Sequence, residues 1–260
     1  MPVHATDDGC RLSYTIAGAA SAPPLVLCNS LGTDRGLWEA QIEAFAASFR
    51  VISHDTRGHG ASDAPAGDYA LARLGADVLS LMDAEGVARA HVCGVSVGGL
   101  TALWLGVHAP ARVGRLVLAN TAARIGSVEL WNTRMRTAAS DGLESLAEAS
   151  MARWFTPAYR HAAPATIARL RAAFCRVPVA GYRGCCAALR DADLSAAVAR
   201  VVAPTVVIIG THDPATPPDA GRWLARTIPG AALVELDAAH LSNVERAPEF
   251  TEAVATFLRG

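Results

Sequence analysis

Short apolar runs rich in β-branched residues alternate along this chain with longer stretches of helical periodicity. The clearest strands are predicted at Leu25–Cys28, Arg50–Ser53, Ala90–Cys93, Arg115–Ala119, Thr205–Ile209 and Ala232–Leu236. Amphipathic stretches such as Trp38–Ser48, Leu71–Glu85 and Leu100–His108 are long enough to be helices that connect them. This alternation is typical of βαβ units around a mostly parallel sheet with helices on both faces. An earlier run, Cys10–Ala17, alternates enough to form an antiparallel edge strand.

The pattern changes between about residues 121 and 200, where helical periodicity continues without a convincing strand. The helices predicted there cover Val128–Ala139, Leu143–Trp154, Pro164–Cys175 and Gly181–Leu189. A helical block inserted between two strands of a parallel sheet is expected over the carboxyl ends of the strands, where ligands bind. We therefore predict one domain, residues 1–260, with a core at 1–120 and 201–260 and a helical cap at about 121–200.

Composition narrows the classes of partner and mechanism. The formal net charge is −1, which gives no reason to expect nucleic acid or a membrane surface as partner. The acidic N-terminal segment has no apolar run, so we expect no signal peptide, and six cysteines are expected to be reduced in a cytoplasmic enzyme. All 23 basic residues are arginine. Mechanisms that need a lysine amine are thereby excluded, and only arginine can bind an anionic substrate with a permanent charge.

The strongest motif is Gly94–Gly98, which reads G-V-S-V-G and places Ser96 between a predicted strand and a predicted helix. A serine on such a sharp turn needs small neighbours two positions away on either side. The turn exposes its hydroxyl at a helix N-terminus, where partial positive charge stabilises developing negative charge. The motif in this context is typical of the nucleophile of α/β-hydrolases, although G-x-S-x-G by itself also occurs in ordinary glycine-rich turns.

A nucleophilic serine needs a base, and the base needs an acid that orients it. Asp213 follows the strand Thr205–Ile209, and His240 follows the strand Ala232–Leu236. This is the order serine, acid, histidine that the fold requires, and three strand ends can converge above one sheet. We predict Ser96, Asp213 and His240 as a catalytic triad.

Other polar residues compete for these roles. His212 precedes the acid and is interpreted as a loop residue, and Asp237 could instead cap a following helix. The position after Arg115–Ala119, which carries the acid in some hydrolases, is Asn120 and cannot hold a negative charge. Five other histidines are interpreted as structural, namely His54, His59, His91, His108 and His161. The first two lie in a loop interpreted as a rigid turn that shapes the floor of the site.

An oxyanion hole requires two backbone N–H groups aimed at the reacting carbonyl oxygen. We assign one to Val97, which follows the nucleophile. The other is assigned to Leu31 in the loop after Leu25–Cys28, a sequence that is also compatible with a plain turn. Histidines, cysteines and acids lack the spacing of a metal site, and no dinucleotide-binding glycine motif is present. No metal and no cofactor are therefore expected.

The cap contributes aromatic and arginine side chains, namely Trp131, Arg134, Trp154, Phe155, Tyr182 and Arg183. Facing a pocket, such residues would suit a small, flat, anionic molecule, because guanidinium binds carboxylate with two hydrogen bonds. Cap aromatics equally serve core packing, and arginines are common on the surface of a chain without lysine. Contact with substrate and a purely structural role are thus both open for each residue.

The chain resembles the 3-oxoadipate enol-lactonases of the β-ketoadipate pathway, a family of α/β-hydrolases, nearly from end to end. The most specific segments are Asn29–Asp34, Gly181–Asp193 and Ala239–Glu245. The resemblance implies hydrolysis of a small anionic lactone through a serine acyl-enzyme, with Ser96, Asp213 and His240 as the triad. It also implies that Trp131, Trp154 and Arg134 contact the lactone, and Arg134 is our first choice for its carboxylate.

Three alternatives use the same residues. A broad carboxylesterase or perhydrolase shares the triad and prefers simple esters, and a hydrolase of carbon–carbon bonds in ring-cleavage products also shares it. A receptor with this fold would bind a ligand without turning it over, and an intact triad argues against that interpretation.

Overall fold

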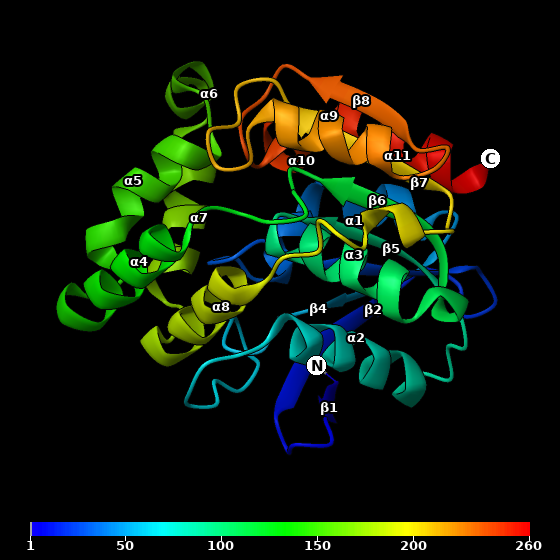
Figure 1. Ribbon diagram of the computed structural model, residues 1–260, viewed down its shortest axis with the longest axis horizontal. Helices are drawn as coiled ribbons and strands as arrows, with labels where there is room; N and C mark the ends of the chain where they lie inside the picture. The colour runs from blue at the N-terminus through cyan, green and yellow to red at the C-terminus, as the bar shows by residue number, and fades with distance from the viewer. Residues whose placement is uncertain (1) are drawn as a thin grey trace.

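The computed structural model describes residues 2–260, so Met1, the first residue of the predicted domain, lies outside the described residues. Eight strands form one sheet in the order β1-β2-β4-β3-β5-β6-β7-β8 (Figure 1). Pairs β1–β2 and β2–β4 are antiparallel, and all other neighbouring pairs are parallel. The strands are β1 Val3–Ala5, β2 Arg11–Ala17, β3 Pro24–Cys28, β4 Arg50–His54, β5 Ala90–Val95, β6 Val113–Ala119, β7 Thr205–Gly210 and β8 Ala232–Leu236.

The helices of the core connect these strands or follow the last one. They are α1 Glu39–Ala46, α2 Leu71–Ala84, α3 Val97–His108, α9 Pro218–Thr227, α10 Ser242–Glu245 and α11 Ala247–Arg259, with short 3₁₀ segments at Arg35–Trp38, Pro110–Arg112 and Val198–Arg200. All the strands predicted from the apolar runs are present within two residues of their expected ends, and the mostly parallel α/β fold is confirmed. Strand β1, which is only three residues long, was not predicted from the sequence.

The strand order determines where the helices lie. The chain passes from β3 through α1 to β4 in one direction along the sheet, and from β4 through α2 to β5 in the opposite direction. Because crossovers between parallel strands are right-handed, this reversal places α1 and α2 on opposite faces. Helix α3 packs against α2, and α11 packs against α1. Both faces are thus covered, and the reversal leaves a crevice at the carboxyl ends of β3 and β5.

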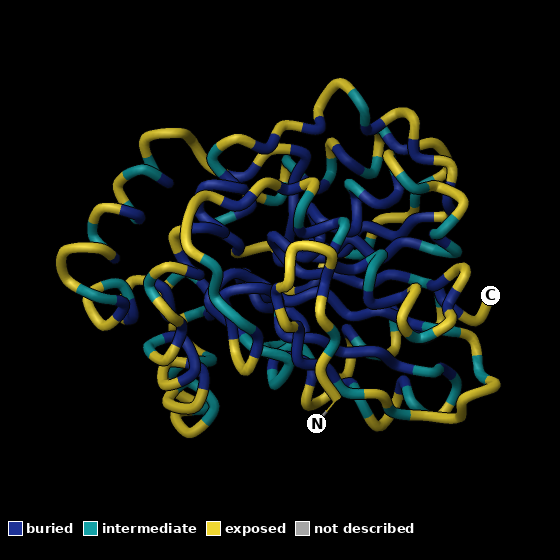
Figure 2. The backbone as a smooth tube through the Cα atoms, turned by 90° about the horizontal axis from the view of Figure 1, so that it is seen from below, coloured by how far each residue is buried: buried dark blue, intermediate teal, exposed yellow. Residues whose placement is uncertain are grey.

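Burial follows from this double coverage. All residues of β7 and nearly all of β5 are buried, as expected for parallel strands with helices on both faces. Edge strands β1 and β8 are mostly exposed. Figure 2 shows the buried trace in the centre of the molecule and exposed loops around it. No helix within residues 2–260 combines the length and the apolar composition needed to cross a membrane.

Five helices lie between β6 and β7 and form a separate group at one end of the molecule, which we call the cap (Figure 1). They are α4 Val128–Asp141, α5 Glu144–Trp154, α6 Pro157–Ala162, α7 Pro164–Cys175 and α8 Val179–Asp191. Helix α8 touches the loop after β4 directly, backbone to backbone. A Cβ atom on Gly181 would lie 2.2 Å from the carbonyl oxygen of Gly58, so only glycine permits this approach.

Candidate active site

Ser96 lies on the sharp turn between β5 and α3, in a conformation that non-glycine residues rarely adopt. Its φ and ψ angles are 60° and −119°, and such strain is typical of functional positions. The glycines two positions away are sterically required, because a Cβ atom on Gly94 or Gly98 would lie 2.2 Å from a backbone oxygen. The turn is held by hydrogen bonds from Ser96 N–H to Ala119 O and from Thr121 Oγ1 to Ser96 O, 3.0 and 2.8 Å long.

Asp213 and His240 form a buried pair in the loops after β7 and β8. His240 Nδ1 lies 2.8 Å from Asp213 Oδ2, and both residues are at most 3 % exposed. The carboxylate also accepts hydrogen bonds from Ala215 N–H, from Thr216 N–H and hydroxyl, and from Asn120 Nδ2 at 2.6 to 3.1 Å. These donors saturate the acid and fix its orientation toward the imidazole.

The electrostatics of this pair favour an ionised acid. Burial alone would raise the pKa of Asp213. The charge of His240, its hydrogen bond to the carboxylate and the hydrogen bonds from Thr216 outweigh burial and lower the pKa to about 2. A carboxylate at neutral pH keeps the proton of His240 on Nδ1, so Nε2 is free to accept a proton.

The structure also places the competitors. Asn120 has a positive φ of 43° and connects the acid to its surroundings, donating to Asp213 and accepting a hydrogen bond from the Ser242 hydroxyl. His212 forms an exposed pair with Asp237, and Asp237 also binds Arg246. Asp237 therefore caps no helix, contrary to the alternative considered for it. His212 is a loop residue, as interpreted.

The loop after β3 presents a free N–H group beside Ser96. Residues 30–33 form a turn closed by Thr33 N–H to Ser30 O, with Gly32 at φ 80°. Gly32 N–H donates to Nε2 of the buried His59, whose pKa burial lowers, so the neutral ring holds the loop in place. Within residues 2–260 the N–H groups of Leu31 and Val97 donate to no acceptor. Both are available to an oxyanion.

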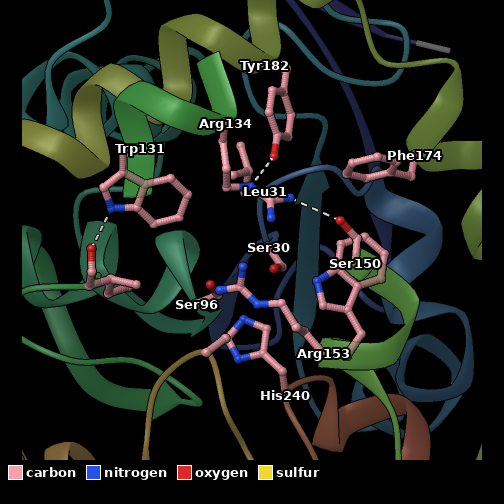
Figure 3. A pocket seen from close by; sticks show the side chains of 13 residues that line it. Ser30, Leu31, Ser96, Trp131, Arg134, Ser150, Arg153, Phe174, Tyr182 and His240 are labelled. Atoms are coloured by element: carbon pink, nitrogen blue, oxygen red, sulfur yellow. Dashed lines mark hydrogen bonds between the residues drawn. The ribbon is translucent and has the colours of Figure 1, made fainter. Parts of the chain in front are cut away.

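One pocket brings most of the predicted site residues together, whereas Asp213 and Val97 do not line it (Figure 3). The strand ends contribute its core side, which includes Ser30, Leu31, Ser96, Ala215 and His240. Helices α4, α5, α7 and α8 contribute its cap side, which includes Trp131, Arg134, Ser150, Arg153, Trp154, Phe174 and Tyr182. Ser96 Oγ and His240 Nε2 share no hydrogen bond within the described chain. Such contacts are often long without substrate and tighten when it binds.

The predicted cap residues divide into two groups. Trp131, Trp154, Arg134 and Tyr182 line the pocket, whereas Phe155 stacks on Tyr159 outside it, and Arg183 is exposed. Two hydrogen bonds hold the Arg134 guanidinium: its Nε donates to Tyr182 Oη at 2.7 Å and an Nη to Ser150 Oγ at 3.0 Å.

Arg153 is the charged pocket residue that was not predicted from the sequence. It lies in the last turn of α5, directly before Trp154, and is half-buried. Burial, together with the charge of Arg134, lowers its pKa. Its position next to Trp154, a predicted pocket residue, was the one signal in the sequence that pointed to Arg153. Nothing else in the sequence pattern distinguished it from the other arginines.

Residues 2–260 contain no group of three or more histidine, cysteine, aspartate or glutamate side chains arranged to hold a metal ion. The arrangement of a strained serine, a histidine–carboxylate pair and two free N–H groups is suited to acyl transfer.

Comparisons with known proteins agree with this geometry. The family model of the α/β hydrolase fold matches residues 23–247. Two 3-oxoadipate enol-lactonases of Acinetobacter baylyi are 39 % and 37 % identical to this chain, covering 98 % and 96 % of it and 95 % and 94 % of their own lengths. The crystal structure of the enol-lactonase from Burkholderia xenovorans LB400 is 46 % identical over the whole of both chains, with a TM-score of 0.98. The chain therefore belongs to the α/β hydrolase fold family and, within it, to the group of the 3-oxoadipate enol-lactonases.

Proposed function

We propose that this protein hydrolyses 3-oxoadipate enol-lactone to 3-oxoadipate in the β-ketoadipate pathway, with Ser96, Asp213 and His240 as catalytic residues. The observation that carries the proposal is the pocket itself. The side chains that line it include Ser96, His240 and two arginines and no carboxylate. An electropositive pocket over an acyl-transfer site favours a small ester or lactone that carries a carboxylate over a neutral ester. Full-length similarity to enol-lactonases selects the lactone within that class.

The proposed reaction begins with proton transfer from Ser96 Oγ to His240 Nε2. The serine oxygen attacks the lactone carbonyl, and the N–H groups of Leu31 and Val97 stabilise the negative oxygen that results. Collapse breaks the ring C–O bond and releases an enolate, which remains tethered within the acyl-enzyme and accepts the proton from His240. Tautomerisation of the enol to the ketone disfavours ring closure. A water molecule deprotonated by His240 then attacks the carbonyl of the Ser96 ester. The bond from that carbon to Ser96 Oγ breaks, His240 returns the proton to Ser96 Oγ, and 3-oxoadipate is released.

The cap side would bind the rest of the substrate. Trp131 and Trp154 offer flat apolar surfaces to the ring, and Trp154 is held edge-on against Phe174.

The six cysteines are all free, and five of them are buried. Their reduced state fits the cytoplasm, where a catabolic enzyme of this kind would work.

The test is loss of the ultraviolet absorbance of 3-oxoadipate enol-lactone on addition of the purified protein, with p-nitrophenyl acetate measured in parallel. We expect rapid loss of the lactone and poor turnover of the ester. The variant Ser96→Ala controls for spontaneous hydrolysis and should be inactive. Good turnover of the ester with an untouched lactone would contradict the proposal and leave a general esterase.

A further inference from the structure

Two arginines on the cap side differ in what holds them. Arg134 is bound by Tyr182 and Ser150. Arg153 forms no hydrogen bond and no ion pair within residues 2–260, although its neighbours in the pocket include several polar groups. Figure 3 shows its side chain reaching from α5 into the pocket toward Ser96 and His240.

An unpaired guanidinium in a partly buried pocket is energetically costly. Burial disfavours its charge and the second arginine repels it, and the attraction of Asp213, which does not line the pocket, offsets these effects only in part. Structures keep such groups where a ligand supplies the missing partner. The ligand must be an anion, and a carboxylate matches the two parallel N–H groups of a guanidinium.

The backbone that carries Arg153 is fixed relative to the catalytic histidine. The carbonyl oxygen of Trp154, the next residue, accepts a 3.0 Å hydrogen bond from Leu241 N–H, directly after His240. Glu245 reinforces this connection, because its carboxylate binds both Thr156 in the cap and Ala239 N–H. The backbone next to Arg153 and the segment that carries His240 are therefore connected directly by hydrogen bonds.

We propose that Arg153, rather than Arg134, forms the subsite for the substrate carboxylate and determines the preference of the enzyme for anionic over neutral acyl substrates. This inference rests on the proposed serine-hydrolase function. Arg134, bound by Tyr182 and Ser150, contributes a second positive charge to the same pocket. The substrate is thereby oriented with its carbonyl at Ser96 and its carboxylate toward α5.

The test uses two p-nitrophenyl esters of equal length, the hexanoate and the monoester of adipic acid, in which a carboxylate replaces the terminal methyl group. The measured quantity is the ratio of kcat/KM for the adipate ester to kcat/KM for the hexanoate ester. We expect Arg153→Gln to lower this ratio about 10²-fold, since a charge-assisted, bidentate contact is lost. Arg153→Lys should recover part of the ratio, because it keeps the charge without the fork.

Matched variants separate the subsite from general charge effects. Arg136→Gln removes one positive charge from the exposed face of α4 and should leave the ratio unchanged. Arg134→Gln should change it less than Arg153→Gln does. Labelling of Ser96 with a fluorophosphonate and a thermal melt verify that each variant is folded.

Two results would overturn the proposal. Equal loss for both esters in Arg153→Gln would show that Arg153 acts on the triad and not on the carboxylate. An unchanged ratio in Arg153→Gln with a large drop in Arg134→Gln would assign the subsite to Arg134. The esters also separate this inference from the proposed function, because a selective drop without lactone turnover would keep the anion subsite and reject only the lactone as substrate.

Discussion

The two sides of the pocket differ in how their polar groups are satisfied. On the core side, the Asp213 carboxylate accepts hydrogen bonds from Asn120, Ala215 and Thr216 in addition to its contact with His240, and His240 is oriented by that carboxylate. On the cap side, Arg134 has two partners and Arg153 has none among the described residues.

This difference matches the demands on each side in the proposed mechanism. Proton transfer needs groups held within a narrow range of geometry before the substrate arrives, so the protein supplies every partner itself. A group that binds substrate needs hydrogen-bond donors that have no partner in the protein, because a donor that is already paired gains little from a ligand. Catalysis is thereby assigned to the strand ends and selectivity to the cap, and three substitutions test this assignment.

The largest effect is expected from Asp213→Asn. An amide cannot hold the His240 proton on Nδ1 by charge, so the imidazole is no longer kept in the tautomer that accepts the serine proton. We expect kcat to fall by about 10⁴-fold. The matched control is Asp237→Asn, which alters the exposed acid nearest to His240 along the loop and should stay close to wild type. Comparable losses in the two variants, measured as steady-state turnover, would refute Asp213 as the orienting acid.

The core side could be predicted from sequence because local signals and topology coincide there. Ser96 lies in a glycine-flanked turn between a strand and a helix, and Asp213 and His240 directly follow apolar strands. Parallel strands end at one edge of a sheet, so residues after different strands converge without any detailed packing argument. The role of Asn120 beside Asp213 was missed, because its side-chain partners come from loops far away in sequence.

The cap side could be predicted only in part. Trp131 and Arg134 are three residues apart on α4 and share a face, so their joint approach to the pocket follows from helical spacing. The orientation of Arg153 depends instead on how α5 docks, through the hydrogen bond between Leu241 N–H and Trp154 O. No local pattern encodes that contact. Strand β1 and helix α6, at three and six residues, are too short to show a periodicity.

A smaller effect is expected from Thr216→Val, which removes the hydroxyl that donates to Asp213 at 2.6 Å. Without this donor the pKa of Asp213 rises from about 2 toward its unfolded value of about 3.9. The ionised acid then contributes less stability at neutral pH, and kcat falls about tenfold as the acid loses one constraint.

The pH dependence gives this prediction its sign. A lowered pKa stabilises the folded state above the unfolded pKa, and that contribution is lost as the pH falls through about 4 toward 2. The difference in unfolding free energy between wild type and Thr216→Val, measured with urea, should thus be constant near neutral pH and shrink below about pH 4. Thr216→Ser, which keeps the hydroxyl, should restore the stability of the wild type. A difference independent of pH down to 3 would mean that only packing was lost.

The smallest effect is expected from Tyr182→Phe, which removes the hydroxyl that binds Arg134 and leaves the buried ring in place. Arg134 keeps Ser150 as a partner, so we expect KM for the carboxylated ester to rise about threefold, with kcat preserved. Tyr159→Phe is the matched control, since that hydroxyl donates to Val244 O away from the pocket. If Tyr182→Phe weakened binding of the carboxylated ester more than Arg153→Gln does, Arg134 would be the residue that binds the substrate carboxylate. The contrast between a satisfied core side and an unsatisfied cap side would then no longer explain selectivity.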